Sequence, residues 1–143
     1  EASFDRTSYE IREKCAEFTG TSAGMHTAAA GVYLATMGPE GMKDVGELIM
    51  HRCAYAKKKF SQLKGVEVKL SGVSFKEFVV DFSGTGKTVK EINEKLLKKN
   101  IIGGLDLSGI YNGMENHMLV CVTEIHSRED IDCLIDAVAD IID

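Results

Sequence analysis

A glycine-rich segment between a predicted strand and a predicted helix, Gly84-Thr-Gly86-Lys87-Thr88, looks like part of a phosphate-binding loop. The complete motif has an earlier glycine where this chain has Asp81, so that successive backbone N–H groups can surround the phosphates. A carboxylate at that position would repel them. We therefore predict a capped turn here in place of a nucleotide site.

The other side chains that could do chemistry are dispersed along the chain. The histidines have no zinc-ligand spacing with one another or with a cysteine or acid; they are His26, His51, His117 and His126. No serine lies in a Gly-x-Ser-x-Gly turn, so hydrolase chemistry has no support. Cys53, Cys121 and Cys133 fall within apolar patterns, which predicts buried free thiols in a reducing compartment. We predict no catalytic, cofactor-binding or metal-binding residue in this chain.

Composition limits the class of protein. The 143 residues are 44% hydrophobic and 27% charged, which is typical of one folded domain. Lys and Arg total 17 against 22 Asp and Glu, and this net charge of −5 offers no clustered positive charge for nucleic acid. We also expect no membrane-spanning segment and no leader peptide, and hence a cytoplasmic location. The chain begins at Glu1 and not at Met, so we expect a piece of a longer protein; a processed N-terminus would look the same.

The spacing of apolar residues divides the chain into a helical part, residues 8–64, and a sheet-and-helix part, residues 65–143. In the helical part we predict helices over residues 9–18, 22–37 and 39–63. Gly38-Pro39 should end one helix and start the next, because Pro is tolerated at the first helical position. The last helix has an apolar stripe at helical spacing, and Gly65 is placed to end it in a left-handed conformation.

In the sheet-and-helix part, the spacing of apolar residues changes from helical steps to alternation. Residues 66–70 and 77–82 alternate like half-buried strands, and the apolar run 118–123 predicts a central strand covered on both faces. Thr88 with Glu91, and Ser127 with Asp130, have the form of helix N-terminal caps. We predict an α/β domain of the two-layer α+β kind over residues 1–143, with N-terminal helices followed by β-β-α-β-α and a largely antiparallel sheet.

The segment from Gly103 to Asn116 is unusual, because it is a long loop that still carries apolar side chains. Ile101-Ile102 before it could add a short edge strand. Gly103 and Gly104 allow close approach of the backbone, and Leu107 and Tyr111 supply apolar anchors. Glu124 follows the predicted central strand, where a side chain can reach a neighbouring cleft. We predict an interface formed by Gly103, Gly104, Leu107, Tyr111 and Glu124; the alternatives are a simple cover over the sheet edge for the loop, and an exposed helix cap for Glu124.

Several stretches in a fixed order carry a family resemblance. They are Ile11-Arg-Glu-Lys14, Ala30-Gly-Val-Tyr-Leu-Ala-Thr-Met-Gly-Pro-Glu-Gly41, Phe75-Lys-Glu-Phe-Val-Val80, Asn100-Ile-Ile-Gly-Gly-Leu105 and Leu119-Val-Cys-Val-Thr-Glu124. Together they resemble the C-terminal part of the first subunit of the split glycine decarboxylase, the P-protein of the glycine cleavage system. Cys15-Ala-Glu-Phe-Thr-Gly departs from the family's usual Ala-Thr-Ser-Asn-type stretch, which leaves open a paralogue of the enzyme.

The resemblance implies the fold of fold-type I pyridoxal-phosphate enzymes, with a large cofactor domain followed by this small one. It also implies that pyridoxal phosphate is bound by a lysine of the partner (second) subunit, in a tetramer with two subunits of each kind. The implied reaction is decarboxylation of glycine, with transfer of the aminomethyl group to the lipoyl carrier protein. No catalytic residue carries over to this chain, so the fragment alone should be inactive.

Two other functions remain possible at this point. The chain could be the small domain of a different fold-type I enzyme, or a free-standing regulatory module that binds a small ligand, since such modules use similar element orders. A preceding segment of about two to three hundred residues in the reading frame would exclude the free-standing module.

Overall fold

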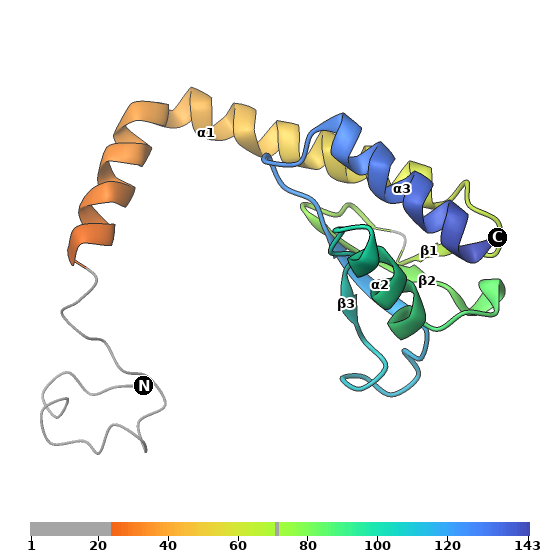
Figure 1. The fold of residues 1–143 in the computed structure, drawn as a ribbon. Coiled ribbons are helices and arrows are strands. Elements are labelled where there is room, and N and C mark those ends of the chain that lie inside the picture. The colour runs from red at the N-terminus through yellow and green to blue at the C-terminus, as the bar shows by residue number, and fades with distance from the viewer. Residues whose placement is uncertain (1–23, 71) are drawn as a thin grey trace, which may run out of the picture. The chain divides into compact units, whose positions relative to one another are not determined.

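The computed structural model describes residues 24–70 and 72–143 (Figure 1). Its helices and strands are α1 (Gly24–Phe60), β1 (Glu67–Lys69), β2 (Glu77–Asp81), α2 (Val89–Lys98), β3 (Leu105–Asp106), β4 (His117–Cys121) and α3 (Arg128–Ile142), with a 3-10 turn at Ser83–Thr85. The chain divides into two compact units after Met42, so α1 contributes to both. The helix predicted over residues 9–18 lies outside the described residues.

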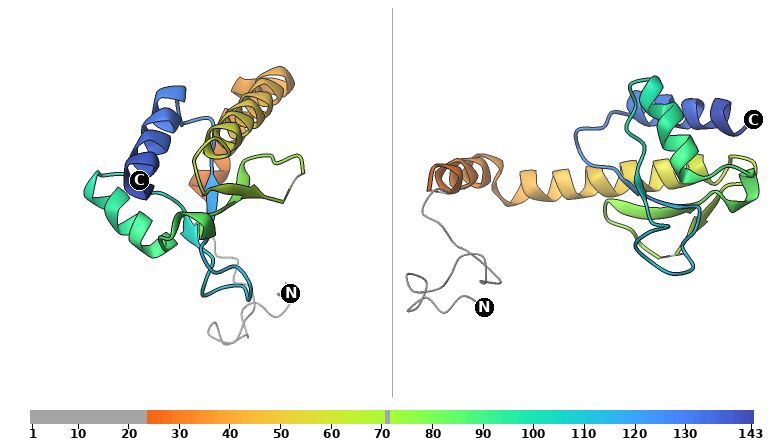
Figure 2. Two further views of the ribbon diagram at one scale, coloured as in Figure 1. Left: turned by 90° about the vertical axis from the view of Figure 1, so that its right-hand side faces the viewer. Right: turned by 60° about the horizontal axis from the view of Figure 1, so that its bottom comes forward.

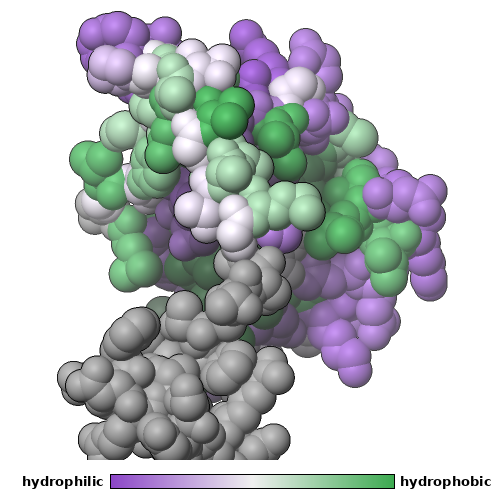
Figure 3. Space-filling model, turned by 90° about the vertical axis from the view of Figure 1, so that its left-hand side faces the viewer, coloured by the Kyte–Doolittle hydropathy of each residue, from purple (hydrophilic) through white to green (hydrophobic). Residues whose placement is uncertain are grey.

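The first part of α1, up to Met42, is apolar and exposed. From Gly24 to Gly38 the sequence contains no Asp, Glu, Lys or Arg. Large side chains stand in solvent, with Met25 83% exposed and Val32 67% exposed. Figure 3 looks onto this end of the helix and shows pale and green surface, which is neutral to hydrophobic. A helix of this composition is normally covered by other protein.

The predicted break at Gly38-Pro39 is confirmed. Gly38 has φ 61° and ψ −177°, so two helical segments meet there without a continuous helical backbone. The residue before a proline is sterically disfavoured in the helical region, and glycine adopts a positive φ at little cost. Pro39 then begins the next helical segment, where its missing N–H leaves no hydrogen bond unmade.

In the second unit, residues 43–143, the rest of α1 packs its apolar stripe inward. The buried residues Ile49, Cys53, Ala56 and Phe60 recur at steps of three and four, as the sequence predicts. Phe60 contacts Phe78 and Phe82 edge-on, with ring centroids 5.8 Å and 6.4 Å apart. After the helix, Gly65 has the expected left-handed conformation at φ 77°. The side chains of this stripe pack the helix against the sheet.

The four strands form one antiparallel sheet in the order β1-β2-β4-β3. Opposite residues include Val80 with Met118 in β2 and β4, and Leu105 with Leu119 in β3 and β4. The three predicted strands are confirmed, and β4 is internal as predicted. The edge strand differs from expectation: it is Leu105–Asp106, and Ile101-Ile102 are not in a strand.

The helices cover one face of the sheet. The core combines α1, α2 and α3 side chains with alternate strand residues, among them Phe78, Val80, Met118 and Val120. Two further views show α2 and α3 beside each other next to the strands (Figure 2). The prediction that both faces of β4 are covered is wrong, because Leu119 is half-buried and Cys121 is exposed on the opposite face. In this apolar run, only the residues on the face that meets the helices are buried in the core.

The two predicted helix caps are confirmed. The Thr88 hydroxyl accepts the Glu91 N–H while the Glu91 carboxylate accepts the Thr88 N–H. Ser127 and Asp130 make the same pair of bonds at α3. Each box satisfies backbone N–H groups that the first helical turn leaves free.

The thiols follow the sequence prediction only in part. Cys53 is fully buried, and this burial raises the pKa of its thiol. Cys121 and Cys133 are free and exposed, so the prediction that they are buried is wrong. Both lie in apolar stretches, but each points away from the core side of its element.

Candidate functional site

The paired glycines Gly103 and Gly104 occupy a place where no side chain fits. A Cβ on Gly104 would collide with the carbonyl oxygen of Leu119 and would lie 2.7 Å from Cγ of Met118. A Cβ on Gly103 would collide with Oδ1 of Asn93. The Asn93 amide donates to the Gly104 carbonyl over 2.9 Å. Asn93 on α2 and the two glycines therefore bring this turn against the internal strand β4.

The loop that follows has defined backbone geometry. The Leu107 N–H donates to the His117 carbonyl over 3.0 Å, which extends the pairing of β3 with β4 by one residue. The Ile110 and Tyr111 N–H groups both donate to the Leu107 carbonyl, and Gly113 completes the turn at φ 79°. Leu107 is only 4% exposed, whereas Tyr111 is 60% exposed. Leu107 is thus fixed within this chain, and Ile110 and Tyr111 are the loop's outward apolar groups.

A pocket of about 680 Å³ opens at this edge of the sheet. β3 pairs only with Met118 and Leu119, so the following residues of β4, Val120 and Cys121, have no β3 partner. The pocket lies along this stretch and is lined mainly by apolar side chains of β4 and α3, together with Gly103 and Gly104. An unpaired strand edge beside an apolar pocket is a surface onto which another segment can dock.

Two polar side chains reach the pocket, His126 and Asp130. The Thr123 N–H donates to Nδ1 of His126 over 3.0 Å, so this nitrogen acts as an acceptor and a neutral ring carries its proton on Nε2. Asp130 caps α3, and the hydrogen bonds from Ser127 lower the pKa of its carboxyl. Both groups are therefore held by local bonds near the start of α3.

The predicted interface residues do not all meet at this pocket. Gly103 and Gly104 line it, whereas Leu107, Tyr111 and Glu124 do not. The Glu124 carbonyl accepts a hydrogen bond of 2.5 Å from the Arg52 guanidinium, and its side chain is exposed. The sequence did not indicate Asn93, His126 and Arg52 as part of a site. Each forms a hydrogen bond with a residue that only the fold or a turn brings near.

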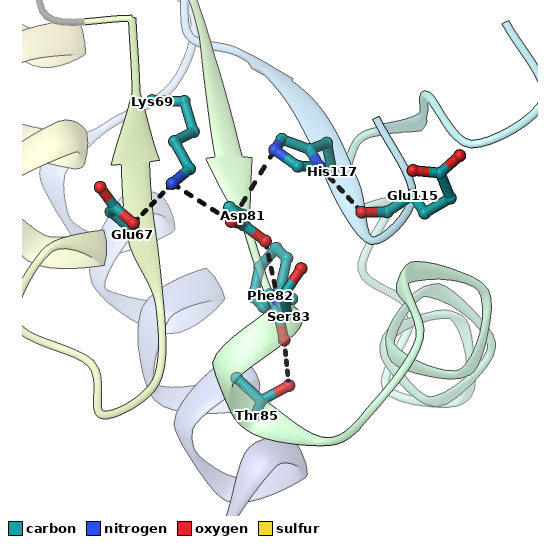
Figure 4. A network of polar contacts seen from close by, with 8 residues as sticks. All are labelled: Glu67, Lys69, Asp81, Phe82, Ser83, Thr85, Glu115 and His117. Atoms are coloured by element: carbon teal, nitrogen blue, oxygen red, sulfur yellow. Dashed lines mark hydrogen bonds and ion pairs between the residues drawn. The ribbon is translucent and has the colours of Figure 1, made fainter. Parts of the chain in front are cut away.

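A second polar cluster lies on the sheet face opposite the helices (Figure 4). Asp81 is 3.4 Å from the Lys69 ammonium and 3.8 Å from Nε2 of His117, and it accepts the Ser83 N–H over 2.8 Å. Partial burial acts to raise the pKa of the Asp81 carboxyl, but the hydrogen bonds from Ser83, the charge of His117 and the hydrogen bond from Lys69 together lower it. The glycine-rich segment after Asp81 is a turn with Gly86 left-handed at φ 71°, as predicted. This cluster binds the strand ends together and offers no phosphate cradle.

The described residues contain neither a metal-ligand cluster nor a membrane-spanning helix. No group of three or more His, Cys, Asp or Glu side chains there could hold a metal ion. No helix in residues 24–70 and 72–143 is long and apolar enough to cross a bilayer.

Comparison with known proteins identifies the family. The family description "Glycine cleavage system P-protein" matches residues 6–138. The chain belongs to this family. Among curated relatives, the "Probable glycine dehydrogenase (decarboxylating) subunit 1" of Bacillus thuringiensis (strain Al Hakam) is 40% identical over 124 residues. The alignment covers 87% of this chain and 27% of that relative, so this P-protein family member spans about a quarter of the relative's length.

Solved structures show the same fold. A crystal structure of glycine decarboxylase (P-protein) in inhibitor-bound form superposes with a TM-score of 0.75 and 23% identity, covering 91% of this chain and 29% of that one. A PLP-bound protein from Clostridium difficile 630, described as an aminotransferase, superposes with a TM-score of 0.60 and 14% identity over 77% of this chain and 28% of that one. The P-protein family member therefore shares its mixed helix-and-antiparallel-sheet architecture with the matched parts of these two structures.

Proposed function

We propose that this chain is the C-terminal small domain of the first subunit of a glycine decarboxylase, and that it supports the reaction without supplying a catalytic residue. The observation that carries the proposal is the family match over residues 6–138, in a chain that spans 27% of a subunit 1 relative. The reaction would be glycine decarboxylation followed by aminomethyl transfer to the lipoyl carrier protein. A cytoplasmic location fits this role.

The lysines within the described residues do not suit covalent attachment of pyridoxal phosphate. A lysine that bonds the cofactor needs a desolvated or electropositive pocket that lowers its pKa. Within the described residues no charged side chain is buried. Hydrogen bonds to Asp132 and to Glu67 instead raise the pKa of Lys59 and Lys69, respectively. We therefore assign the cofactor to the second subunit, which would pair with the first in a heterotetramer.

Three surfaces of the chain support an interface role. The first part of α1 is apolar and exposed, Ile110 and Tyr111 project from the loop after β3, and the pocket beside Gly103 and Gly104 borders an unpaired strand edge. Exposed apolar areas of this kind mark contacts with other protein. The rest of the subunit and the second subunit are the partners that would cover them. Residues 1–143 would then form one domain of that subunit.

Replacing Tyr111 with Ala in the full-length subunit tests the interface. Because the side chain is 60% exposed, we expect little change in the stability of the 143-residue chain and weaker association with the second subunit, by about tenfold or more. Sedimentation measures association, and glycine-dependent release of carbon dioxide measures turnover by the reconstituted enzyme. Lys98→Gln, on the exposed side of α2, is the matched control.

The outcomes separate the two parts of the proposal. Association and turnover at wild-type levels in Tyr111→Ala would show that the loop only covers the sheet edge. Full decarboxylase activity from the second subunit alone would remove the supporting role of this chain altogether.

A further inference from the structure

A smaller pocket of about 240 Å³ lies between α1 and the start of α3, separate from the edge of the sheet. Its lining is His51, Arg52, Tyr55, Arg128 and Ile131, all within residues 43–143. Three of these five side chains are basic. Arg52 and Arg128 give this pocket two positive charges, and Glu129, Asp130 and Asp132 lie close by in α3.

Both guanidinium groups in the pocket are held in place. Nη1 of Arg52 donates to the Glu124 carbonyl over 2.5 Å. The Arg128 guanidinium stacks on the Tyr55 ring, with Cζ 4.7 Å from the ring centroid. The Tyr55 hydroxyl in turn donates to the Asp132 carboxylate over 2.7 Å, which fixes the ring. A guanidinium has five N–H donors, so these contacts do not use all the donors of either arginine.

The neighbouring carboxylates have hydrogen-bond or ion-pair partners of their own, while their charges also act on the arginines: Asp132 on Arg128, and Asp130 on Arg52. Asp132 is paired with Lys59 at 2.8 Å and also accepts the Tyr55 hydroxyl. Asp130 accepts the Ser127 N–H over 2.8 Å in the helix cap. Glu129 acts on Arg128 through its charge without an ion pair. Among residues 24–70 and 72–143, neither Arg52 nor Arg128 has a carboxylate oxygen within 4.0 Å.

We propose that Arg52, Arg128 and His51 form a binding site for one oxyanion group, a phosphate or a carboxylate. A guanidinium presents parallel N–H donors that match two oxygens of such a group, and two guanidiniums in the lining of one pocket supply both charge and orientation. Because a water molecule takes about 30 Å³ in the liquid, the pocket has room for a tetrahedral anion and part of its hydration shell. The proposal does not depend on the function proposed above.

Titration with inorganic phosphate, followed by backbone amide and arginine side-chain NMR signals, tests the site on the 143-residue protein. We expect saturable shifts confined to Arg52, Arg128 and the first turn of α3. Arg128→Gln removes an exposed guanidinium and should weaken phosphate binding about tenfold or more. Arg52→Lys keeps the charge but loses the planar fork, and should weaken it as well. Lys98→Gln removes the same charge elsewhere and should bind like wild type; circular dichroism checks that every variant is folded.

Acetate in a parallel titration distinguishes the two sources of an oxyanion. Binding of phosphate in clear preference to acetate would assign a phosphate-bearing ligand, and comparable binding of acetate would assign a carboxylate; either result supports the site. Unsaturable shifts spread over all basic residues, or equal phosphate binding by wild type and Arg128→Gln, would overturn it.

Discussion

The interior of the second unit and the first part of α1 are both apolar, but they differ in what completes them. In the second unit, α1, α2 and α3 cover one face of the sheet, and Phe60, Phe82, Ile92 and Leu96 are fully buried. In the first part of α1, Met25, Val32 and Leu34 are more than half exposed. Burial of apolar surface is what stabilises a fold. The apolar residues inside the second unit therefore stabilise this chain, whereas those in the first part of α1 are exposed and suited to contact with other protein.

The largest expected effect comes from a matched pair of aromatic truncations. Phe60→Ala removes a buried ring that contacts Phe78 and Phe82, and we expect the free energy of unfolding to fall by about 3–5 kcal/mol. Tyr33→Ala removes a ring that is 49% exposed, and the change should stay near 0.5 kcal/mol. Urea denaturation of the 143-residue chain measures both. Similar losses for the two variants would remove the distinction between the regions.

A glycine pair sharpens the comparison at the edge of the sheet. Gly104→Ala places a methyl group against the Leu119 carbonyl, and forcing β4 and the turn apart should cost about 1–3 kcal/mol. Gly46→Ala is the control, since a Cβ there has nothing within 4 Å and lies in a helix, where Ala is favoured by about 0.5–1 kcal/mol. In the same denaturation assay, we expect Gly104→Ala to lower the free energy of unfolding and Gly46→Ala to raise it. A neutral Gly104→Ala would mean that the turn does not need its close approach to β4.

The smallest effect concerns pH. The folded-state pKa of Asp81 is lowered, so its contribution to stability is present above the carboxyl's ordinary pKa and is lost as pH falls through the lower folded value. As pH is lowered from about 5 to about 3, the Asp81→Asn variant should lose less stability than wild type. Thermal melts at stepped pH measure this. An unchanged pH profile in Asp81→Asn would show that other carboxyls carry the acid dependence.

The sequence by itself determined the features that depend on neighbours a few residues away. The caps at Thr88 and Ser127, the left-handed Gly65 and the break at Gly38 all follow from hydrogen bonds or steric limits within one or two turns. The three main strands followed from their two-residue period. These interactions are local, and residue type therefore reports them directly.

Tertiary structure alone decided the rest. It showed that one face of β4 lacks a helix, that Leu107 is buried while Tyr111 is exposed, and that Gly103 and Gly104 are needed by their approach to Leu119 and Asn93. It also brought Arg52 of α1 beside Arg128 of α3 in one pocket. Each of these depends on distances between segments far apart in the chain. Apolar character or spacing cannot report such distances, because the same residue type serves the core, an interface or a pocket wall according to what packs against it.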